Sequence, residues 1–308
     1  KNGCNASWKE TAMITATKKK HSFDFVHRTI LIWPAVILML IFFIAPILLT
    51  FVYSFTNLAL TGSAAKDVKI IGFDNYIKMF KNPDVWLSIK ATLIFLLGSV
   101  IGQQLLGFFI AFMMKNTRVG FRRAVGPCIL AGWVMPELVA AMCLYAFFAD
   151  NGTLNTLLIA VFGIKKIAWL YKHAMLCVVL ANIWHGTAFS MLMYQAALDN
   201  VPHDMEEAAI IDGANRWQVL RYITLPVVKD TISTSLMLNT LSTLGVYTLI
   251  YTMTGGGPNM DTMTLPLYMY RQAFVGYQLG YGTAISMILL VIGIVFSVLY
   301  TRFCRDQV

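Results

Sequence analysis

Polar side chains interrupt three otherwise apolar stretches of this 308-residue sequence, and they are the residues best suited to chemistry. In the first stretch, Trp133 and Glu137 stand four residues apart with a proline between them. The second reads "NIWHGTAF" and combines an amide, an imidazole and two aromatic rings. In the third, Thr243 and Tyr247 are again four apart, with Asn239 one helical turn earlier. Aromatic faces beside hydrogen-bonding groups suit a sugar ring, whose C–H face stacks while its hydroxyl groups bond.

The second stretch has a polar face at helical spacing. Its residues at intervals of three and four fall on one side of a helix: Asn182, His185, Gly186 and Phe189. The candidate substrate-binding residues of all three stretches are Trp133, Glu137, Asn182, Trp184, Gly186, Phe189, Thr243 and Tyr247. Packing offers a second interpretation, because Trp184 also suits lipid contact and Asn182 an interhelical hydrogen bond. On the packing interpretation, Glu137 pairs with another polar group of the bundle, and His185 is a packed, neutral imidazole.

The composition indicates that these stretches lie in a membrane. Hydrophobic residues make up 58% of the chain and charged residues 13%, with a mean hydropathy of +0.66. Soluble domains carry about 25% charged residues. Six windows each supply the ~20 apolar residues that a spanning helix needs: residues 29–55, 91–114, 124–149, 174–198, 231–253 and 272–301. The sequence therefore predicts an all-α membrane protein with six transmembrane helices.

Glu137 is the one Lys, Arg, Asp or Glu inside these windows. A charged side chain at the centre of a membrane helix costs roughly 2.5–3.5 kcal/mol on insertion scales. We therefore expect Glu137 to face a cavity lined by protein rather than lipid. Because a carboxylate there repels a uronate or a sugar phosphate, we also expect neutral sugars to be preferred over anionic ones.

The positive charges predict the orientation of the helices. Fifteen of the 24 Lys and Arg residues lie in the two termini and in the second-to-third and fourth-to-fifth connections. Positive charge is retained in the cytoplasm, so both termini are expected there. The expected parts are a cytoplasmic tail at 1–28, a six-helix domain at 29–304 with a charged loop at 199–229, and a cytoplasmic tail at 305–308.

The remaining composition argues against other classes of protein. The net charge of +9 is explained by this topology and by anionic lipid, so no nucleic-acid partner is required. Five cysteines show no paired spacing, so neither a disulfide framework nor a metal site is indicated. No catalytic cluster appears, and the motif Gly-Lys-Ser/Thr of an ATP-binding loop is absent from the sequence.

The loop at 199–229 contains a short acidic helix. The segment "EEAAIIDGA" follows a helix-start pattern in which Asp199 or Asn200 is expected to cap and Pro202 to occupy the first turn. Gly213 is expected to end the helix, and a second short helix is expected at 217–222. The small residues of the EEAAIIDGA helix would let a groove on a partner protein approach the backbone closely. A surface helix resting on lipid headgroups explains the same composition.

The segment "MEEAAIIDGANRWQVLRYITLP", from Met205 to Pro226, resembles the EAA loop of ATP-binding-cassette importer permeases. Three further segments, "GFDNYIKMF", "DNGTLN" and "TGGGPNMDT", resemble loops of the carbohydrate-importing branch of that family. The likeness runs from about Ile30 to Cys304 and is greatest to maltose-type permease subunits. It implies the type I importer permease fold and a coupling helix that docks into a cleft of the ATPase subunit. The coupling residues are then Glu207, Ala208, Ala209, Asp212, Gly213 and Ala214.

The resemblance also implies the partners and the setting. The chain would be a non-catalytic permease in a prokaryotic cytoplasmic membrane, paired with a second, similar permease as a heterodimer. Two ATPase subunits would use ATP and Mg, this chain holding no cofactor of its own, and an external solute-binding protein would deliver the sugar. In the maltose-type pattern Asn182, Trp184 and Gly186 match, whereas Phe189 replaces a tyrosine. Thr243 and Val246 stand where asparagines are expected.

Two other functions are considered. An ion-coupled secondary transporter would use Glu137 and His185 as a proton relay and would show internal repeats, of which none is convincing. An intramembrane enzyme would need a catalytic cluster. Neither function requires the EAA loop.

Overall fold

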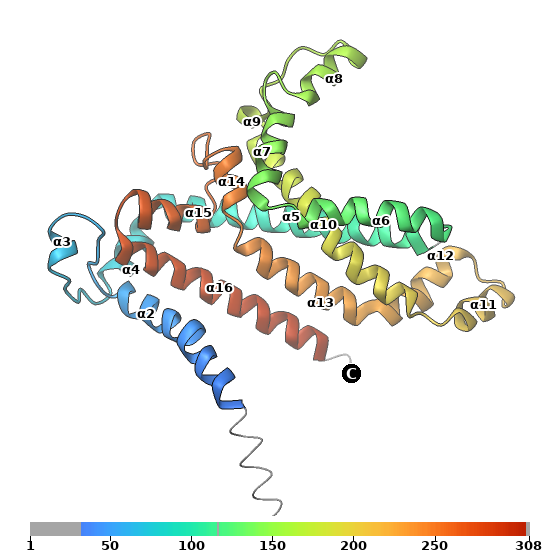
Figure 1. The fold of residues 1–308 in the computed structure, drawn as a ribbon, viewed down its shortest axis with the longest axis horizontal. Helices are drawn as coiled ribbons and strands as arrows, with labels where there is room; N and C mark the ends of the chain where they lie inside the picture. Colours follow the sequence, from blue (N-terminus) through green and yellow to red (C-terminus); the bar gives the residue numbers. More distant parts are fainter. Residues whose placement is uncertain (1–31, 116, 306–308) are drawn as a thin grey trace, which may run out of the picture. The chain divides into compact units, whose positions relative to one another are not determined.

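The computed structural model describes residues 32–115 and 117–305, which are almost entirely helical (Figure 1). The chain forms two units, Lys1–Tyr53 and Ser54–Val308. In the first unit, the described residues belong to a helix that contains the π-helical turn η1 (Leu40–Ile44) and continues into α2 (Ala45–Ser54). No side chain between residues 32 and 53 is buried, and the exposed ones are mostly apolar. Such a surface is typical of a helix that faces lipid. The expected tail at 1–28 lies outside the described residues.

The second unit is built on a close pair of long helices, α5 (Pro83–Lys115) and α10 (Ala174–Asp199). Small residues let their backbones approach each other, as is common between membrane helices. A Cβ atom added at Gly107 of α5 would lie 2.5 Å from the Cβ of Ser190 in α10. Helix α13 (Leu225–Leu244) packs against both members of the pair, and α16 (Leu279–Arg305) packs against α13.

Five segments of the described chain can cross a membrane by length and composition. Four are single helices, at Ile32–Ser54, Pro83–Lys115, Ala174–Asp199 and Leu279–Arg302. The fifth is a bent pair, Gly120–Val134 and Glu137–Phe162, whose axes differ by 101°. The predictions of an unbroken helix at 124–149 and at 231–253 were wrong. The prediction for 174–198 agrees with α10 to one residue.

The first break separates α6 (Val119–Val134) from α7 (Glu137–Phe148). Met135 has extended backbone angles, with φ −61° and ψ 133°. A residue that precedes proline is sterically disfavoured in the helical conformation, and Pro136 follows. The proline thus ends α6 and leaves Glu137 as the first residue of α7.

The second break follows α13, which ends at Leu244 with Gly245 as its cap. The chain turns through Val246 and resumes as α14 (Thr248–Met253). Tyr247 precedes α14 with φ −134°, so it does not continue the α13 helix. Thr243 and Tyr247 therefore do not share a helix face, although they are four residues apart.

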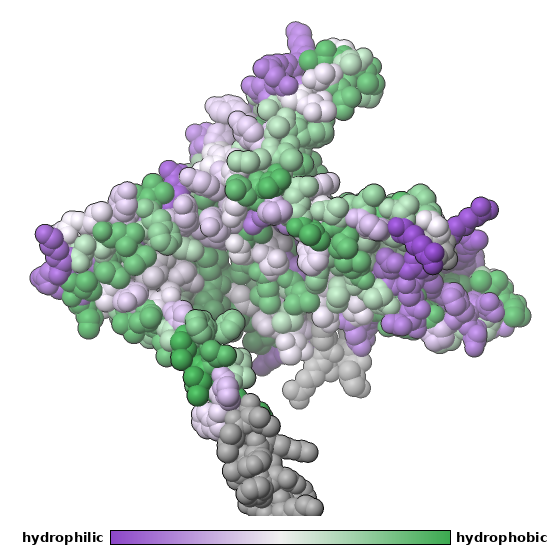
Figure 2. All heavy atoms as spheres, viewed as in Figure 1, coloured by the Kyte–Doolittle hydropathy of each residue, from purple (hydrophilic) through white to green (hydrophobic). Residues whose placement is uncertain are grey.

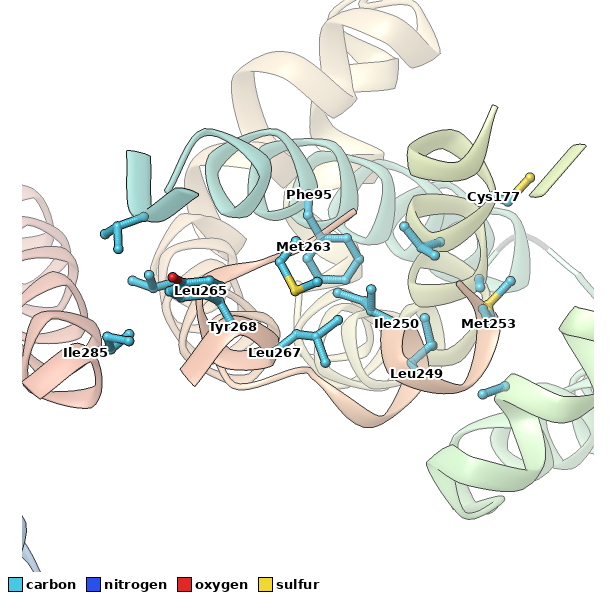
Figure 3. Packing of buried hydrophobic residues seen from close by; sticks show 14 of the residues in the cluster. Phe95, Cys177, Leu249, Ile250, Met253, Met263, Leu265, Leu267, Tyr268 and Ile285 are labelled. Carbon is cyan, nitrogen blue, oxygen red and sulfur yellow. The ribbon is translucent and has the colours of Figure 1, made fainter. Parts of the chain in front are cut away.

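A core of apolar side chains holds α14 and the segment after it against the long helices (Figure 3). Phe95 of α5, Ile250 of α14 and Ile285 of α16 are fully or almost fully buried in it. So are Leu265 and Tyr268 of α15 (Leu265–Tyr270). The Leu265 N–H also donates to Thr92 Oγ1 of α5 at 2.7 Å. The residues after α13 are therefore firmly packed, despite their short helices.

Short elements connect the long helices. They are α3 (Ser63–Lys66), α4 (Asp74–Lys81), α8 (Thr153–Phe162), α9 (Trp169–Lys172), α11 (His203–Ile211), α12 (Arg216–Val219), η2 (Leu220–Thr224) and η3 (Arg271–Val275). Helix α16 begins at Leu279 rather than at residue 272, because Gly276 and Tyr277 interrupt the helix, Tyr277 with a positive φ of 57°. Helices α11 and α12 lie together beyond the end of α10 (Figure 1).

Candidate functional site

A cavity of about 510 Å³ opens where the break between α6 and α7 meets α10 and α13. This volume lies in the range of about 300–1,000 Å³ typical of small-molecule sites. Its lining residues are Gln103, Trp133, Glu137, Asn182, His185, Gly186, Phe189, Leu238, Asn239, Ser242, Thr243, Gly245 and Val246. The three polar stretches of the sequence thus converge on one cavity.

One wall of the cavity is aromatic. The rings of Trp133 on α6 and Phe189 on α10 pack with their centroids 5.9 Å apart and tilted by 39°. Trp133 is 42% exposed, so its ring face is available to a ligand. Because aromatic faces carry partial negative charge, they attract the polarised C–H groups of a bound molecule.

Buried amides form the polar part of the lining. Gln103 Nε2 donates to the backbone oxygen of Asn182 at 2.9 Å. Gly186 makes this contact possible, since a Cβ atom there would lie 2.3 Å from Gln103 Nε2. Asn239 Nδ2 donates to Ser190 Oγ at 2.6 Å. Asn182 also lines the cavity, and its Nδ2 is buried without a hydrogen-bond partner in the described chain. An unpaired buried donor costs about 1–3 kcal/mol.

Glu137 lies at the N-terminal ends of both α7 and α14, the helices that follow the two breaks. It is the first residue of α7, and its Oε1 accepts a hydrogen bond from the Leu249 N–H in the first turn of α14, at 3.2 Å. Carboxylates are stabilised at helix N-termini, where N–H groups lack partners within the helix. The described cavity lining contains no Lys or Arg. Glu137 therefore combines a structural pairing with a position at the cavity.

His185 forms a hydrogen bond to the backbone at the break between α6 and α7. Its Nε2 donates to the backbone oxygen of Met135 at 3.2 Å, which satisfies a carbonyl that the interrupted helix leaves free. Among the described hydrogen bonds, none joins His185 to Glu137. The two side chains thus bind different backbone groups, and the proton relay considered from the sequence has no direct link between them.

Six of the eight candidate substrate residues line this cavity, and two do not. Trp184 is 46% exposed and lines a separate, mostly apolar pocket with Cys143 and Phe147. It points away because residue 184 falls on another face of α10 than Asn182 and Gly186. Tyr247 lies just beyond the lining residue Val246 and stacks on Tyr270, with ring centroids 5.2 Å apart.

Two polar lining residues were not predicted from the sequence. Gln103 belongs to a Gln-Gln pair within an apolar window, and Ser242 precedes Thr243. A polar pair inside a membrane helix is itself a signal, because such groups usually face a cavity or another helix.

The charged loop forms the expected short helix, α11. It ends as anticipated at Gly213, whose φ is 90°. The Ala214 N–H donates to Ala209 O at 2.9 Å and the Gly213 N–H to Ile210 O at 3.0 Å, the two bonds of a Schellman motif. The start differs from the prediction. Pro202 precedes the helix without a side-chain cap, and Asn200 caps the C-terminus of α10 instead.

The second short helix of this loop begins earlier than expected. Asn215 and Gln218 form a reciprocal capping box, so α12 starts at Arg216 rather than at Trp217. It runs through η2 into α13 without a break. The loop is therefore one short free helix followed by the first turns of a long one.

The surface of this loop is open to a partner. Of the residues expected to couple, Glu207, Ala208, Asp212 and Gly213 are exposed, whereas Ala209 and Ala214 are half-buried. Ile211 of this loop is a large apolar side chain that is 84% exposed. Hydrophilic side chains gather around α11, α12 and the start of α6 (Figure 2). This end of the unit thus differs from the apolar surface of the long helices.

Two ion pairs attach the loop to the membrane helices. Lys115, the last residue of α5, lies 2.6 Å from Glu206 of α11, and both side chains are largely buried. Arg122 of α6 binds both carboxylate oxygens of Asp199 at the end of α10. No group of three His, Cys, Asp or Glu side chains in the described part of the chain is placed to hold a metal ion.

Residues 103–306 match the model of a family described as binding-protein-dependent transport system inner membrane component. The chain is 29% identical over 282 residues to the trehalose/maltose transport system permease protein MalF of Thermococcus litoralis, covering 90% of this chain and 94% of that protein. It is 30% identical over 281 residues to the sulfoquinovosyl glycerol transport system permease protein SmoG of Agrobacterium fabrum, covering 90% of each.

A solved structure has the same fold. It is the crystal structure of a bacterial alginate ABC transporter in complex with an alginate pentasaccharide-bound periplasmic protein. The similarity has a TM-score of 0.79 at 22% sequence identity, and it covers 94% of this chain and 97% of the other.

Proposed function

The chain belongs to the family of binding-protein-dependent transport system inner membrane components, and we propose from this that it is the permease subunit of an ATP-driven sugar importer. It is a multi-pass membrane protein and a non-catalytic permease. The observation that carries the sugar assignment is the cavity with its aromatic wall and its lining of amide and hydroxyl side chains. Relatives named for trehalose/maltose and sulfoquinovosyl glycerol transport support the same class of substrate.

The proposed complex contains four kinds of protein. A second, similar permease would form a heterodimer with this chain, and two ATPase subunits would hydrolyse ATP with Mg. A solute-binding protein would deliver the sugar to the outer face. The family description and the binding protein in the related solved complex support the delivery step. ATP must be used by a partner, because this sequence lacks the phosphate-binding motif.

The sugar would bind in the cavity between α6, α10 and α13. Trp133 and Phe189 would stack on the ring, while Asn182, Thr243 and Glu137 would bond its hydroxyl groups. Gly186 contributes by admitting Gln103. Trp184 and Tyr247 lie outside this cavity and have other roles in the proposal.

A neutral sugar suits this cavity better than an anionic one. Interrupted membrane helices commonly bind anionic substrates through the N–H groups at their N-terminal ends. Here Glu137 lies at the start of α7 and already accepts the Leu249 N–H. A substrate carboxylate would meet this charge without a Lys or Arg in the described lining to offset it.

Helix α11 is proposed as the coupling helix, with residues 199–229 in the cytoplasm. Its exposed Glu207, Ala208 and Ile211 would enter a groove on an ATPase subunit. The same orientation places both termini, including the tails at 1–28 and 305–308, in the cytoplasm. It requires six crossings within residues 29–304, with α13 and α14 together making the fifth.

Uptake of a panel of sugars by the reconstituted complex tests this proposal. We expect Trp133→Ala to lower the apparent affinity for a neutral sugar about fivefold, since one aromatic contact contributes about 1 kcal/mol. Trp86→Ala is the matched control, because Trp86 is also exposed but lies outside the cavity. Equal effects of the two variants, or a wild-type complex that imports no sugar, would refute the proposal.

A further inference from the structure

Four aromatic residues beside the cavity form a second surface suited to carbohydrate, which we call the aromatic platform. They are Tyr247 before α14, Tyr251 on α14, Tyr270 at the end of α15 and Phe274 on η3. Tyr270 is the centre of the group. Its ring centroid lies 5.2 Å from that of Tyr247, 5.7 Å from that of Tyr251 and 5.5 Å from that of Phe274.

The platform is exposed although its rings pack together. Tyr247, Tyr251 and Phe274 are 38%, 48% and 51% exposed, while Leu249 and Ile250 of the same segment are fully buried. Helix α14 therefore turns its aliphatic side to the core and Tyr251 outward, and Tyr247 just before the helix is exposed as well. The three tyrosine hydroxyl groups have no hydrogen-bond partner among the described residues.

The platform follows the cavity lining along the chain. Gly245 and Val246 line the cavity, and Tyr247 is the next residue. The bond from the Leu249 N–H to Glu137 fixes this turn of the chain to the cavity wall. Tyrosines at a membrane surface usually serve as separate anchors to lipid headgroups. Here the tyrosines share one centre, in a segment whose preceding residues line a polar cavity, and such a cluster is the arrangement expected for a ligand.

We propose that the aromatic platform is a binding subsite for the further units of a neutral oligosaccharide whose first units occupy the cavity. This inference rests on the proposed function. Each pyranose ring has a C–H face for stacking and hydroxyl groups at its edge, and the platform offers ring faces with free phenol groups beside them. A cavity of about 510 Å³ suits a short sugar, so a longer chain must extend along its rim.

Uptake as a function of sugar length tests the platform. The complete complex is reconstituted with one solute-binding protein and given neutral mono- and oligosaccharides of increasing length. We expect Tyr251→Leu to raise the apparent KM for the longest imported sugar about three- to tenfold, the effect of losing one stacking contact. The KM for the shortest imported sugar stays unchanged. Tyr251→Phe keeps the ring and retains most of the affinity for the longest sugar.

Controls separate the two proposals. Tyr171→Leu changes another exposed tyrosine, on α9 and far from the platform in the sequence, and is expected to leave the KM for all sugars unchanged. If the complex imports sugars but Tyr251→Leu raises the KM equally for every sugar length, the platform is refuted and the proposed function is not. Import of monosaccharides only would also refute the platform alone. A wild-type complex that imports no sugar would refute the proposed function and the platform with it.

Discussion

Glu206 connects the proposed coupling helix to two membrane helices through a single carboxylate. Its Oε1 accepts hydrogen bonds from Lys115 Nζ at 2.6 Å and from Thr224 Oγ1 at 3.0 Å. Lys115 ends α5, and Thr224 ends η2, which continues into α13. A displacement of α11 by an ATPase would therefore reach α5 and α13 through this contact. We predict that Glu206→Gln uncouples ATP hydrolysis from transport.

The magnitude follows from the burial and the distance. The side chains of Lys115 and Glu206 are 11% and 17% exposed. At 2.6 Å the attraction is about 6 kcal/mol with an effective dielectric constant near 20. Desolvation offsets much of it. Hydrogen bonds to charged groups contribute about 1.5–3 kcal/mol net. Glu206→Gln keeps the shape and one acceptor oxygen, so we expect the interaction between Glu206 and Lys115 to weaken by about 2 kcal/mol. This corresponds to a change of about 30-fold in the equilibrium between α11 bound to α5 and α11 detached from it.

The assay compares uptake with ATP hydrolysis in the same proteoliposomes. We expect Glu206→Gln to lower the sugar imported per ATP while basal hydrolysis persists. Lys115→Met should have the same effect, and the double variant should be no worse than either single one. Asp204→Asn is the matched control, because it converts an exposed acid on the same helix to an amide.

A double-mutant cycle provides the refutation. Contacting residues give an interaction energy, whereas independent residues add to within about 0.5 kcal/mol. Additive effects of Glu206→Gln and Lys115→Met would show that the pair does not carry the coupling. An intact Glu206→Gln complex with normal uptake per ATP would also contradict the reasoning.

Two further predictions concern single backbone contacts. Gly213→Ala should lower uptake without disrupting the complex, because a side chain at φ 90° strains the end of α11 by about 1–2 kcal/mol; Gly213→Asn, which tolerates positive φ better, should lower it less, and the reverse order in an uptake assay would count against this. Glu137→Ala should lower both uptake and Tm by leaving the Leu249 N–H unpaired, at a cost of about 1–3 kcal/mol. Glu137→Gln retains an acceptor and should have the smaller effect, so equal Tm values for the two variants would contradict the hydrogen bond.

Sequence patterns predicted the long, uniform elements well. The window at 174–198 agrees with α10 because it lacks charge and proline and lies between clear polar boundaries. Gly213 ends α11 as its residue type predicts. The start of α11 differs from the prediction because the Asn200 backbone N–H bonds to Ala197 O and Leu198 O of α10, and α11 begins only after Pro202. Competition between adjacent helix ends depends on the tertiary path and cannot be judged from composition.

Two residues that were paired on a wrong premise nevertheless line the same cavity. Trp133 and Glu137 were paired because residues four apart share a helix face, yet a break separates them. Both line the cavity all the same, because α6 ends and α7 begins beside it. The prediction that the two residues lie near each other therefore agrees with the structure, but its premise of one continuous helix was wrong. Gln103 was not predicted, because length and hydropathy identify residues 91–114 as a membrane helix but do not show which face lines a cavity.

The two interrupted helices explain why the cavity exists at this place. Irregular backbone at membrane depth is tolerated where it is buried in protein or lines a cavity, since lipid offers no hydrogen bonds. At the first break, His185 binds the free carbonyl of Met135. At the second, Glu137 binds the free N–H of Leu249. Each break is thus stabilised by a polar side chain from another segment, and those side chains are the ones that line the cavity. The acid and the imidazole that looked costly in apolar helices are there because the helices are not continuous.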